Sequence, residues 1–144
     1  MSIVVREATD GDVDALASLS TQLGYPADAS TMRERLRRVQ SLRAGCVFVA
    51  VEDGSVVGWT HVVERVQLED APLAEIAGLI VEGTMRGSGV GAQLLQAAEA
   101  WARERGYMRM RVRSNVMRER AHRFYEREGY VGVKRQVVFE KVLG

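Results

Sequence analysis

The sequence predicts an α/β fold with a mixed, mostly antiparallel central sheet flanked by helices, in a single domain over residues 1–144. Three observations support this fold class. A run of strand-like segments joined by short turns precedes segments of the strand–helix–strand type, and a glycine-rich turn leads from a strand into a helix. The length is typical of one domain, and the chain contains no linker, repeat or low-complexity segment.

One strand and two helices are predicted at the N-terminus. Residues 3–6 form the strand, and Asp10 can cap a helix that ends at Gly24. The apolar residues of this helix recur at helical spacing: Val13, Leu16, Leu19 and Leu23. Thr31 and Glu34 have the spacing of a capping box, which predicts a second helix from Thr31 through about Gln40.

Three strands are predicted in the middle of the chain. The first two cover residues 46–52 and 55–64, and Asp53-Gly54 between them is typical of a tight hairpin turn. Residues 67–72 are polar and predict a loop. The third strand covers residues about 74–81.

The last third predicts two helices and further strands. A helix over residues 92–105 ends at Gly106, and a strand follows over 107–113. A second helix covers residues about 118–128. The apolar runs in 130–133 and 136–142 predict a final hairpin.

Composition excludes several classes of function. The formal charge of +1 argues against a protein that binds nucleic acid by electrostatics. The single cysteine, Cys46, lies in an apolar run and is predicted to be a core thiol, so no internal disulfide can form. Two histidines and one cysteine do not predict a metal site. No signal pattern and no apolar stretch of ~20 residues occurs, so we expect a cytoplasmic protein without a membrane partner.

The glycine turn, residues 86–92, reads Arg-Gly-Ser-Gly-Val-Gly-Ala and is the strongest functional signal. Backbone amides at such a turn, with the positive end of a helix dipole, favour a phosphate group. A nucleoside-triphosphate loop is excluded because Ala92 and Gln93 replace its Lys-Ser/Thr pair. A dinucleotide site fits Gly87, Gly89 and Ala92, but the following strand offers no acid for the ribose and only ~50 residues follow the turn.

A third pattern, Arg/Gln-x-x-Gly-x-Gly/Ala, is matched by Arg86, Gly89 and Gly91. This turn resembles the coenzyme A pyrophosphate loop of the GCN5-related N-acetyltransferases. The resemblance extends to the strand before the turn and to a second motif, which comprises Asn115, Ala121, Phe124-Tyr125-Glu126 and Gly129-Tyr130. The chain departs from many members in one respect, because residues 82–85 lack the proline of that loop.

The resemblance implies a central strand that splays from its neighbour and an enzyme that transfers the acetyl group of acetyl-CoA to a primary amine. The acceptor would be a small molecule, such as an aminoglycoside or a polyamine. A protein N-terminus or lysine is an alternative acceptor, and a non-catalytic acyl-CoA-binding module is an alternative function. The family's habit further implies a homodimer. The residues implied to bind the cofactor are Leu79, Ile80, Val81, Arg86, Gly87, Ser88, Gly89, Val90, Gly91, Ala92 and Asn115.

Two catalytic residues are predicted on the same basis. Tyr125 is the candidate general acid that protonates the departing thiolate. Glu75 is the candidate base, and His61 or the solvent are alternatives. The acceptor pocket is expected between the loop of residues 23–31 and the loop of residues 64–72. Its lining is expected to include Tyr25, Trp59, Glu64, Glu69 and Asp70, whose acids would suit a cationic amine.

Overall fold

Five strands form one sheet in the order β1-β2-β3-β4-β5, with antiparallel pairing up to β4 and parallel pairing between β4 and β5. The strands are β1 (Ile3–Glu7), β2 (Gly45–Glu52), β3 (Ser55–Gln67), β4 (Asp70–Val81) and β5 (Met110–Val112). The helices are α1 (Val13–Gln22), α2 (Ala29–Leu42), α3 (Val90–Glu104) and α4 (Glu119–Arg127). The mixed, mostly antiparallel sheet confirms the predicted fold class.

This computed structural model describes residues 2–114 and 117–144. The chain divides into two compact units, Met1–Val112 and Arg113–Gly144. No helix within the described residues is long and apolar enough to cross a membrane. Whether residues 1–144 behave as a single domain stays a prediction.

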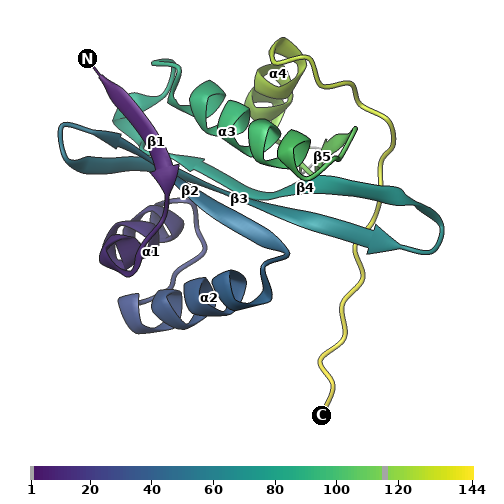
Figure 1. Cartoon of the computed structure of the whole chain (residues 1–144), viewed down its shortest axis with the longest axis horizontal. Coiled ribbons are helices and arrows are strands. Elements are labelled where there is room, and N and C mark those ends of the chain that lie inside the picture. Colours follow the sequence, from purple (N-terminus) through teal and green to yellow (C-terminus); the bar gives the residue numbers. More distant parts are fainter. Residues whose placement is uncertain (1, 115–116) are drawn as a thin grey trace. The chain divides into compact units, whose positions relative to one another are not determined.

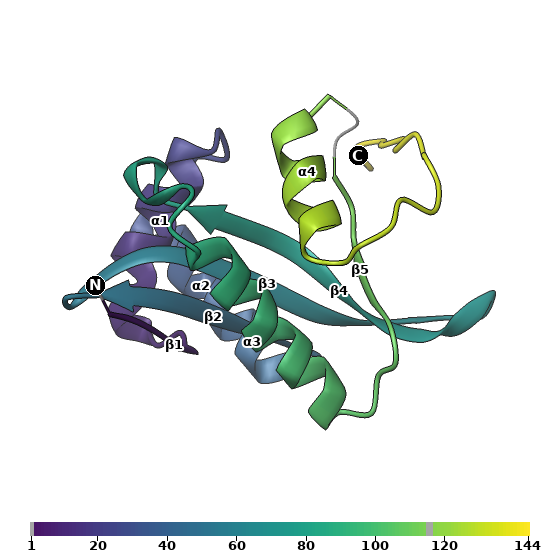
Figure 2. The same cartoon turned by 90° about the horizontal axis from the view of Figure 1, so that it is seen from above.

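In the first unit, α1 and α2 cover one face of the sheet and α3 covers the other (Figure 1, Figure 2). The core is therefore divided by the sheet. On the first face the buried cluster comprises Ala8, Val13, Leu16, Leu36 and Val49. On the second face it comprises Ala50, Val90 and Leu94. Both faces being apolar explains why β2 reads as a nearly continuous hydrophobic run.

Gly58 of β3 allows α3 to pack closely on the sheet. A Cβ atom at this position would lie 2.9 Å from the Ile80 carbonyl oxygen and 3.0 Å from Leu94 Cδ1. Because no larger residue fits there without displacing backbone, the glycine fixes how near the start of α3 comes to β4. This approach positions the glycine turn.

Both N-terminal helices begin at other residues than the sequence predicted. A 3₁₀ turn, Asp10–Asp12, precedes α1, and the Asp12 carboxylate accepts a hydrogen bond from Thr9 N–H at 2.8 Å. Helix α2 begins at Ala29 because the Asp28 carboxylate accepts from Thr31 N–H at 2.7 Å. Asp10 and Thr31 were therefore the wrong caps. Asp10 and Asp12 can both cap the first helix by residue type, and Asp28 and Thr31 can both cap the second. Only the path of the backbone decides which of the two residues does so.

The predicted loop over residues 67–72 was also wrong, because β3 and β4 continue through it as a hairpin. Gln67 pairs with Asp70 across the turn. Leu68 is fully exposed. Backbone pairing rather than burial holds this end of the hairpin, and the Asp70 carboxylate adds ion pairs to Arg109 (3.0 Å) and Arg111 (3.5 Å) of the neighbouring segment. Strands made of polar residues lack the apolar pattern from which strands are predicted, so the sequence indicated a loop here.

The second unit contains α4, which confirms the predicted last helix, and an extended C-terminal segment, residues 130–144. Gly129 ends the helix with φ = +93°. The predicted hairpin over 130–133 and 136–142 was wrong, since the C-terminal segment has no regular secondary structure. A strand needs a hydrogen-bonded neighbour, and alternation of apolar residues does not supply one. The predicted strand over 107–113 is reduced to β5.

Candidate functional site

The glycine turn connects β4 to α3 through a sharp change of backbone direction. Gly87 and Gly89 have φ = +83° and +88°, a region that other residues enter only with strain. A Cβ atom at either position would meet nothing within 4 Å. The space above the turn is therefore open. Gly89 is the N-cap of α3, so the helix begins at Val90, two residues earlier than predicted.

The amides of the first turn of α3 are directed toward this open space. The first hydrogen bond of the turn runs from Gln93 N–H to Gly89 O at 3.1 Å. The amides of Val90, Gly91 and Ala92 precede it and lack a helical acceptor, as at every helix N-terminus. Together with the helix dipole they favour an anion. Val90 is 1% exposed, which anchors the backbone that carries these amides.

The remaining residues of the glycine turn lie at the surface. Ser88 is half-buried and its hydroxyl donates to Met85 O, which closes the turn. Arg86 is exposed. In the segment that lacks the family's proline, Thr84 donates to the Glu82 carboxylate.

Strand β4 bends just before the glycine turn. His61 of β3 pairs with Gly78, whereas Val62 pairs with Ile76, so Ala77 is an extra residue that forms a β-bulge. On the other side, pairing with β5 ends at Ile76 and Val112. Residues 77–81 thus stay paired with β3 on one edge and have no strand on the other edge in the described part of the chain. This confirms the splayed central strand.

Leu79, Ile80 and Val81 make up the free end of β4. Leu79 and Val81 pack toward α3 with the second core cluster, and Ile80 is buried on the opposite side. With the side chains directed to the two faces, the backbone groups of these residues lie in the plane of the sheet, at the splayed edge.

Thr60, which sequence reasoning did not assign to the site, and Trp59, which was expected in the acceptor pocket, hold the bulge in place. The buried Thr60 hydroxyl donates to Gly78 O at 2.8 Å. The Trp59 ring lies so close to Gly78 that an added Cβ would come within 3.0 Å of two ring atoms. In the sequence, the only indications of this arrangement were Thr60 within an apolar strand and Gly78 in the strand that pairs with it.

Glu75 lies one residue before the end of β4–β5 pairing. Its side chain is 10% exposed and forms an ion pair with Arg65 of β3, with Oε2 and Nη1 3.3 Å apart. Its register partners are Val63 and Arg111. Glu75 is thus a buried carboxylate with an arginine partner, located where β4 and β5 separate.

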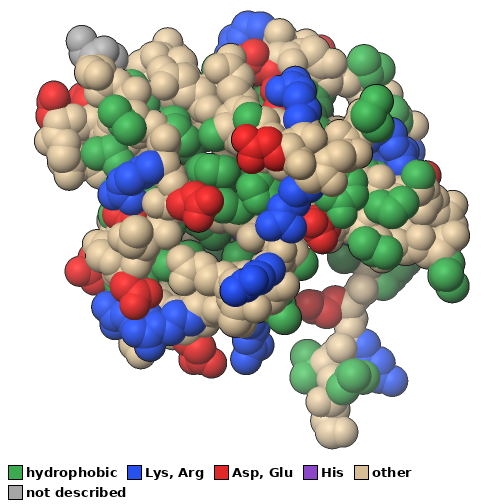
Figure 3. Space-filling view, viewed as in Figure 1, with side chains coloured by type: hydrophobic (Ala, Val, Ile, Leu, Met, Phe, Trp, Pro, Cys, Tyr) green, Lys and Arg blue, Asp and Glu red, His purple; other side chains and the backbone are tan. Residues whose placement is uncertain are grey.

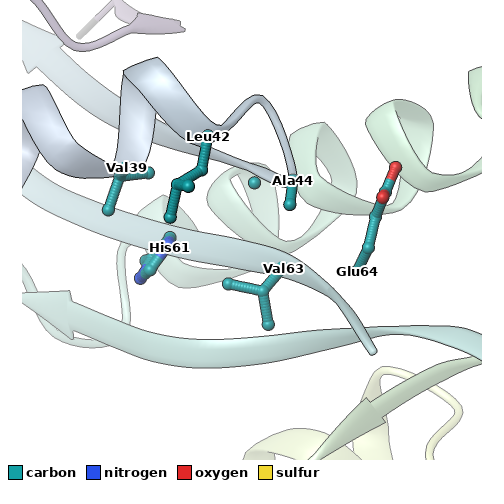
Figure 4. Close-up of a pocket in the computed structure, with 7 residues that line it drawn as sticks. Val39, Leu42, Ala44, His61, Val63 and Glu64 are labelled. Atoms are coloured by element: carbon teal, nitrogen blue, oxygen red, sulfur yellow. The ribbon is translucent and has the colours of Figure 1, made fainter. Parts of the chain in front are cut away.

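His61 lines a cavity of about 250 Å³ between α2 and β3. Figure 4 shows Val39 and Leu42 of α2 on one side of this cavity and His61 on β3 on the other. His61 Nε2 is buried and has no hydrogen-bond partner among the described residues. Burial lowers the pKa of His61, because the charged ring would lose its hydration.

The acids that were expected to attract a cationic acceptor are bound to arginines. Glu64 Oε1 lies 2.7 Å from Arg105 Nη1, and Asp70 bonds Arg109 and Arg111. Of the other expected pocket residues, Tyr25 and Glu69 are exposed. Trp59 packs against the core cluster under α1 and α2.

Tyr125 lies on α4 in the second unit. Its ring makes edge contacts with Phe124 and Tyr130, with centroids 5.1 and 5.8 Å apart. Burial raises the pKa of Tyr125, so its phenol stays protonated at neutral pH. That is the state a general acid requires. Asn115, predicted to contact the cofactor, lies outside the described residues.

The family model described as "Acetyltransferase (GNAT) family" matches residues 13–130. The chain belongs to the GNAT family. It is 33% identical to the aminoglycoside N(6')-acetyltransferase type 1 of Stenotrophomonas maltophilia over 96% of this chain and 93% of that protein. It is 41% identical to the aminoalkylphosphonate N-acetyltransferase of Salmonella typhimurium over 57% of this chain and 54% of that protein.

The fold of this acetyltransferase is similar to that of AAC(6')-Iy, solved in complex with the bisubstrate analogue CoA-S-monomethyl-acetylneamine. The TM-score is 0.89 at 17% identity, covering 99% of this chain and 100% of that chain. The family and these relatives establish the chain as an acetyl-CoA-dependent N-acetyltransferase. The open glycine turn and the free end of β4 fit the pyrophosphate and the extended arm of such a cofactor.

Proposed function

We propose that this acetyltransferase acetylates a primary amine of a small molecule, with the cofactor held along the splayed end of β4. The observation that carries the proposal is the continuity of β4 with the glycine turn. Residues 77–81, which have no strand neighbour on the β5 side among the described residues, lead within one unit to a helix N-terminus with free amides. An extended chain ending in a pyrophosphate matches this sequence of features.

The cofactor would be bound mainly by backbone groups. The amides of residues 87–92 would donate hydrogen bonds to the pyrophosphate, and Arg86 would add a positive charge beside it. Leu79, Ile80 and Val81 would pair with the pantetheine arm, and Asn115 would contact the same arm. The Leu79 amide would donate to the thioester carbonyl, where negative charge develops during transfer. Fixing both ends of the cofactor converts the encounter of thioester and amine into a local reaction.

Two side chains would handle protons. The Tyr125 phenol, protonated because burial raises its pKa, would give its proton to the departing thiolate. Glu75 would draw the amine's proton through a water, since it lies beside the point where β4 and β5 separate. His61 is the alternative base, because its pKa is lowered and its ring is neutral at pH 7.

The charge pattern favours an acceptor with one amine over a polycation. Glu64 and Asp70 already neutralise arginines, so they offer little attraction to further positive charge. The two curated relatives act, by their names, on an aminoglycoside and on an aminoalkylphosphonate. An amine that also carries an acidic group has less net positive charge than an aminoglycoside and therefore fits this charge pattern better.

A panel of amines tests the proposed function. We expect thiol release from acetyl-CoA to be stimulated by small primary amines, most by those with an acidic group, and not by a peptide with a free N-terminus or lysine. Tyr125→Phe should lower kcat ~100-fold with little change in the KM for acetyl-CoA, as for loss of a general acid. Glu75→Gln should lower kcat more than His61→Gln does.

Each failure in this panel has a separate meaning. If coenzyme A binds but no amine stimulates turnover, the chain is a non-catalytic acyl-CoA-binding module. If only peptides are acetylated, the acceptor is a protein. Full activity of Tyr125→Phe would remove that residue from the reaction.

We further propose that the chain acts as one domain, in the cytoplasm and as a homodimer, with no nucleic-acid or membrane partner and no metal. The near-zero formal charge supports the absence of a nucleic-acid partner. Within the described residues no group of histidine, cysteine and acidic side chains is arranged to hold a metal.

A further inference from the structure

Three charged residues of the first unit form a cluster on one face of the sheet, where β4 and β5 separate. They are Arg65 of β3, Glu75 of β4 and Arg111 of β5. Arg65 Nη1 donates to Glu75 Oε2 at 3.3 Å, and Arg111 is the register partner of Glu75 in the parallel pairing. Register partners on adjacent strands project their side chains from the same face, so the two arginines flank the carboxylate.

The burial of this cluster distinguishes it from ion pairs at the surface. Figure 3 shows basic side chains beside acidic ones at several places on the visible face, so opposite charges alone do not mark a site. The side chains of Glu75 and Arg111 are 10% and 19% exposed, whereas those of Arg37 and Asp10 in a surface pair are 63% and 53% exposed. Charges withdrawn from water interact more strongly with a charged ligand than exposed charges do.

The surroundings of the cluster carry more positive than negative charge. Arg65, Arg109 and Arg111 share the carboxylates of Glu75 and Asp70, at nitrogen–oxygen distances of 3.0 to 3.5 Å. Arg111 makes the longest of these contacts, and Arg65 Nε is buried without a hydrogen-bond partner among the described residues. Guanidinium groups with donors to spare bind a carboxylate or a phosphonate well, because the planar fork matches two oxygen atoms.

The neighbouring side chains on this face favour oxygen atoms over further amines. Trp59 Nε1 and His61 Nε2 are buried and, within the part of the chain that the structure describes, have no partner. Indole and guanidinium N–H groups can only donate hydrogen bonds, and an ammonium group can also only donate. Oxygen atoms of an acceptor molecule can pair with these groups, whereas additional amines would leave the indole and guanidinium donors unpaired.

The order of features along β4 gives the acceptor an orientation. The glycine turn follows Val81, the bulge lies at Ala77, and Glu75 precedes the bulge. Arg65 pairs with Leu73, which lies farther from the glycine turn. With the cofactor along the splayed end of β4, its thioester lies nearest the bulge. The amine then faces Glu75, and the remainder of the acceptor extends toward Arg65.

The cavity between α2 and β3 adjoins this path. Val63 lines the cavity and is the register partner of Glu75, so the two side chains share a face. The rest of its lining includes Val39 and Leu42, which Figure 4 shows on α2. Its volume is about 250 Å³. A cavity of about 150 Å³ is known to hold benzene, so this space suits a short carbon chain rather than several sugar rings.

We propose that the acceptor carries a carboxylate or phosphonate on the same short chain as its amine, and that Arg65 and Arg111 bind this acid group while the amine faces Glu75. An amine without an acid group leaves both guanidinium groups without this partner and is used less well. The inference rests on the proposed function, to which it adds the substrate class and the residues that select it.

Matched substrates test the proposal on the native enzyme. Glycine, 3-aminopropanoate and 4-aminobutanoate are each compared with the corresponding amide, which has the same carbon chain and no negative charge, and 3-aminopropylphosphonate is compared with 3-aminopropanamide. We expect kcat/KM for at least one acid to exceed that of its amide tenfold or more, as for a hydrogen bond between charged groups. A preference for only the carboxylate or only the phosphonate identifies the acid group that is recognised.

Two results would overturn the proposal, and they differ in what they say about the proposed function. Equal kcat/KM values for acids and amides would remove the acid group from recognition and leave acetylation of small amines intact. Absence of turnover with every amine, while coenzyme A still binds, would remove both the proposed function and this inference.

Substitution of Arg65 separates contact with the acid group from contact with Glu75. Arg65→Gln should reduce the preference for acid over amide at least tenfold, whereas Arg65→Lys, which keeps the charge but not the planar fork, should retain part of it. An effect exerted only through Glu75 would lower kcat/KM for both substrates by the same factor. An unchanged preference in Arg65→Gln would therefore overturn the assignment of Arg65.

Arg37→Gln is the matched control, because it removes an arginine from the surface ion pair with Asp10. It should leave the preference within about twofold. Loss of preference in this variant as large as in Arg65→Gln would mean that overall charge, and not the cluster, selects the acid. Far-ultraviolet circular dichroism identifies a variant that fails to fold, and the comparison of substrates on the native enzyme does not depend on any variant.

Discussion

Trp59, His61 and Arg65 occupy alternate positions of β3 and therefore the same face of the sheet. Trp59 Nε1, His61 Nε2 and Arg65 Nε are buried without a hydrogen-bond partner among the described residues. Most buried polar atoms in proteins are paired with protein or water, so such a row marks a place for water or ligand atoms. Glu75 lies across from this row on β4, which supports an acceptor site on this face.

The buried His61 ring predicts a dependence of stability on pH. Burial lowers the pKa of His61 in the folded protein below its ordinary value of about 6.5. As pH falls below about 6.5, the unfolded chain takes up a proton that the folded chain disfavours, so the free energy of unfolding falls. Above that pH the contribution is constant.

We expect His61→Gln to reduce the loss of thermal stability between about pH 7 and about pH 5. Thermal unfolding followed at several pH values for both proteins measures the two slopes. Equal slopes would mean that the His61 ring does not resist protonation. Glu64, which lines the same cavity, is bound to Arg105 in both proteins, so it does not account for a difference.

Among the elements, the junction of the glycine turn with α3 has a backbone conformation that favours glycine, and it adjoins the amides proposed to bind pyrophosphate. Gly89 and Gly106 flank the helix, both with positive φ and with open space where a Cβ would lie. Substitution by alanine should destabilise the fold at either position by ~1–2 kcal/mol, the cost of a left-handed residue with a side chain. Only Gly89 adjoins the amides proposed to bind pyrophosphate.

Gly89→Ala should therefore weaken coenzyme A binding about tenfold, whereas Gly106→Ala should leave it unchanged at a similar loss of stability. Calorimetric titration with coenzyme A measures the affinity, and urea unfolding measures the stability. Equal effects of both substitutions on affinity would indicate that strain alone, and not contact with the cofactor, explains the loss.

The sequence was most informative where structure is set by neighbouring residues. The glycine turn, the Asp53-Gly54 hairpin and α4 depend on local conformational preference, and all three were predicted. The bulge at Ala77 was implied only by family resemblance, because register depends on how two strands pair. The arginine partners of Glu64 and Asp70 lie far away in sequence. Their pairing, which changes the expected charge of the acceptor site, could not be read from the acids themselves.

For the whole molecule, the choice between coenzyme A and a dinucleotide has a direct thermodynamic consequence. A ligand that binds only the folded state stabilises it by about 2.7 kcal/mol at a concentration 100 times its dissociation constant. We expect acetyl-CoA to raise the melting temperature by several degrees and NADH to leave it unchanged. Thermal shift measurements with both ligands decide the matter. Stabilisation by NADH alone would restore the dinucleotide interpretation of the glycine turn.

The single cysteine affects how the whole molecule can be studied. Cys46 is buried in β2, and burial, with the charge of Glu7 nearby, raises the pKa of its thiol to about 12. Almost no thiolate is present at neutral pH, so thiol reagents should leave the native protein unmodified. Coenzyme A released during turnover can therefore be titrated with such reagents without a background from the enzyme.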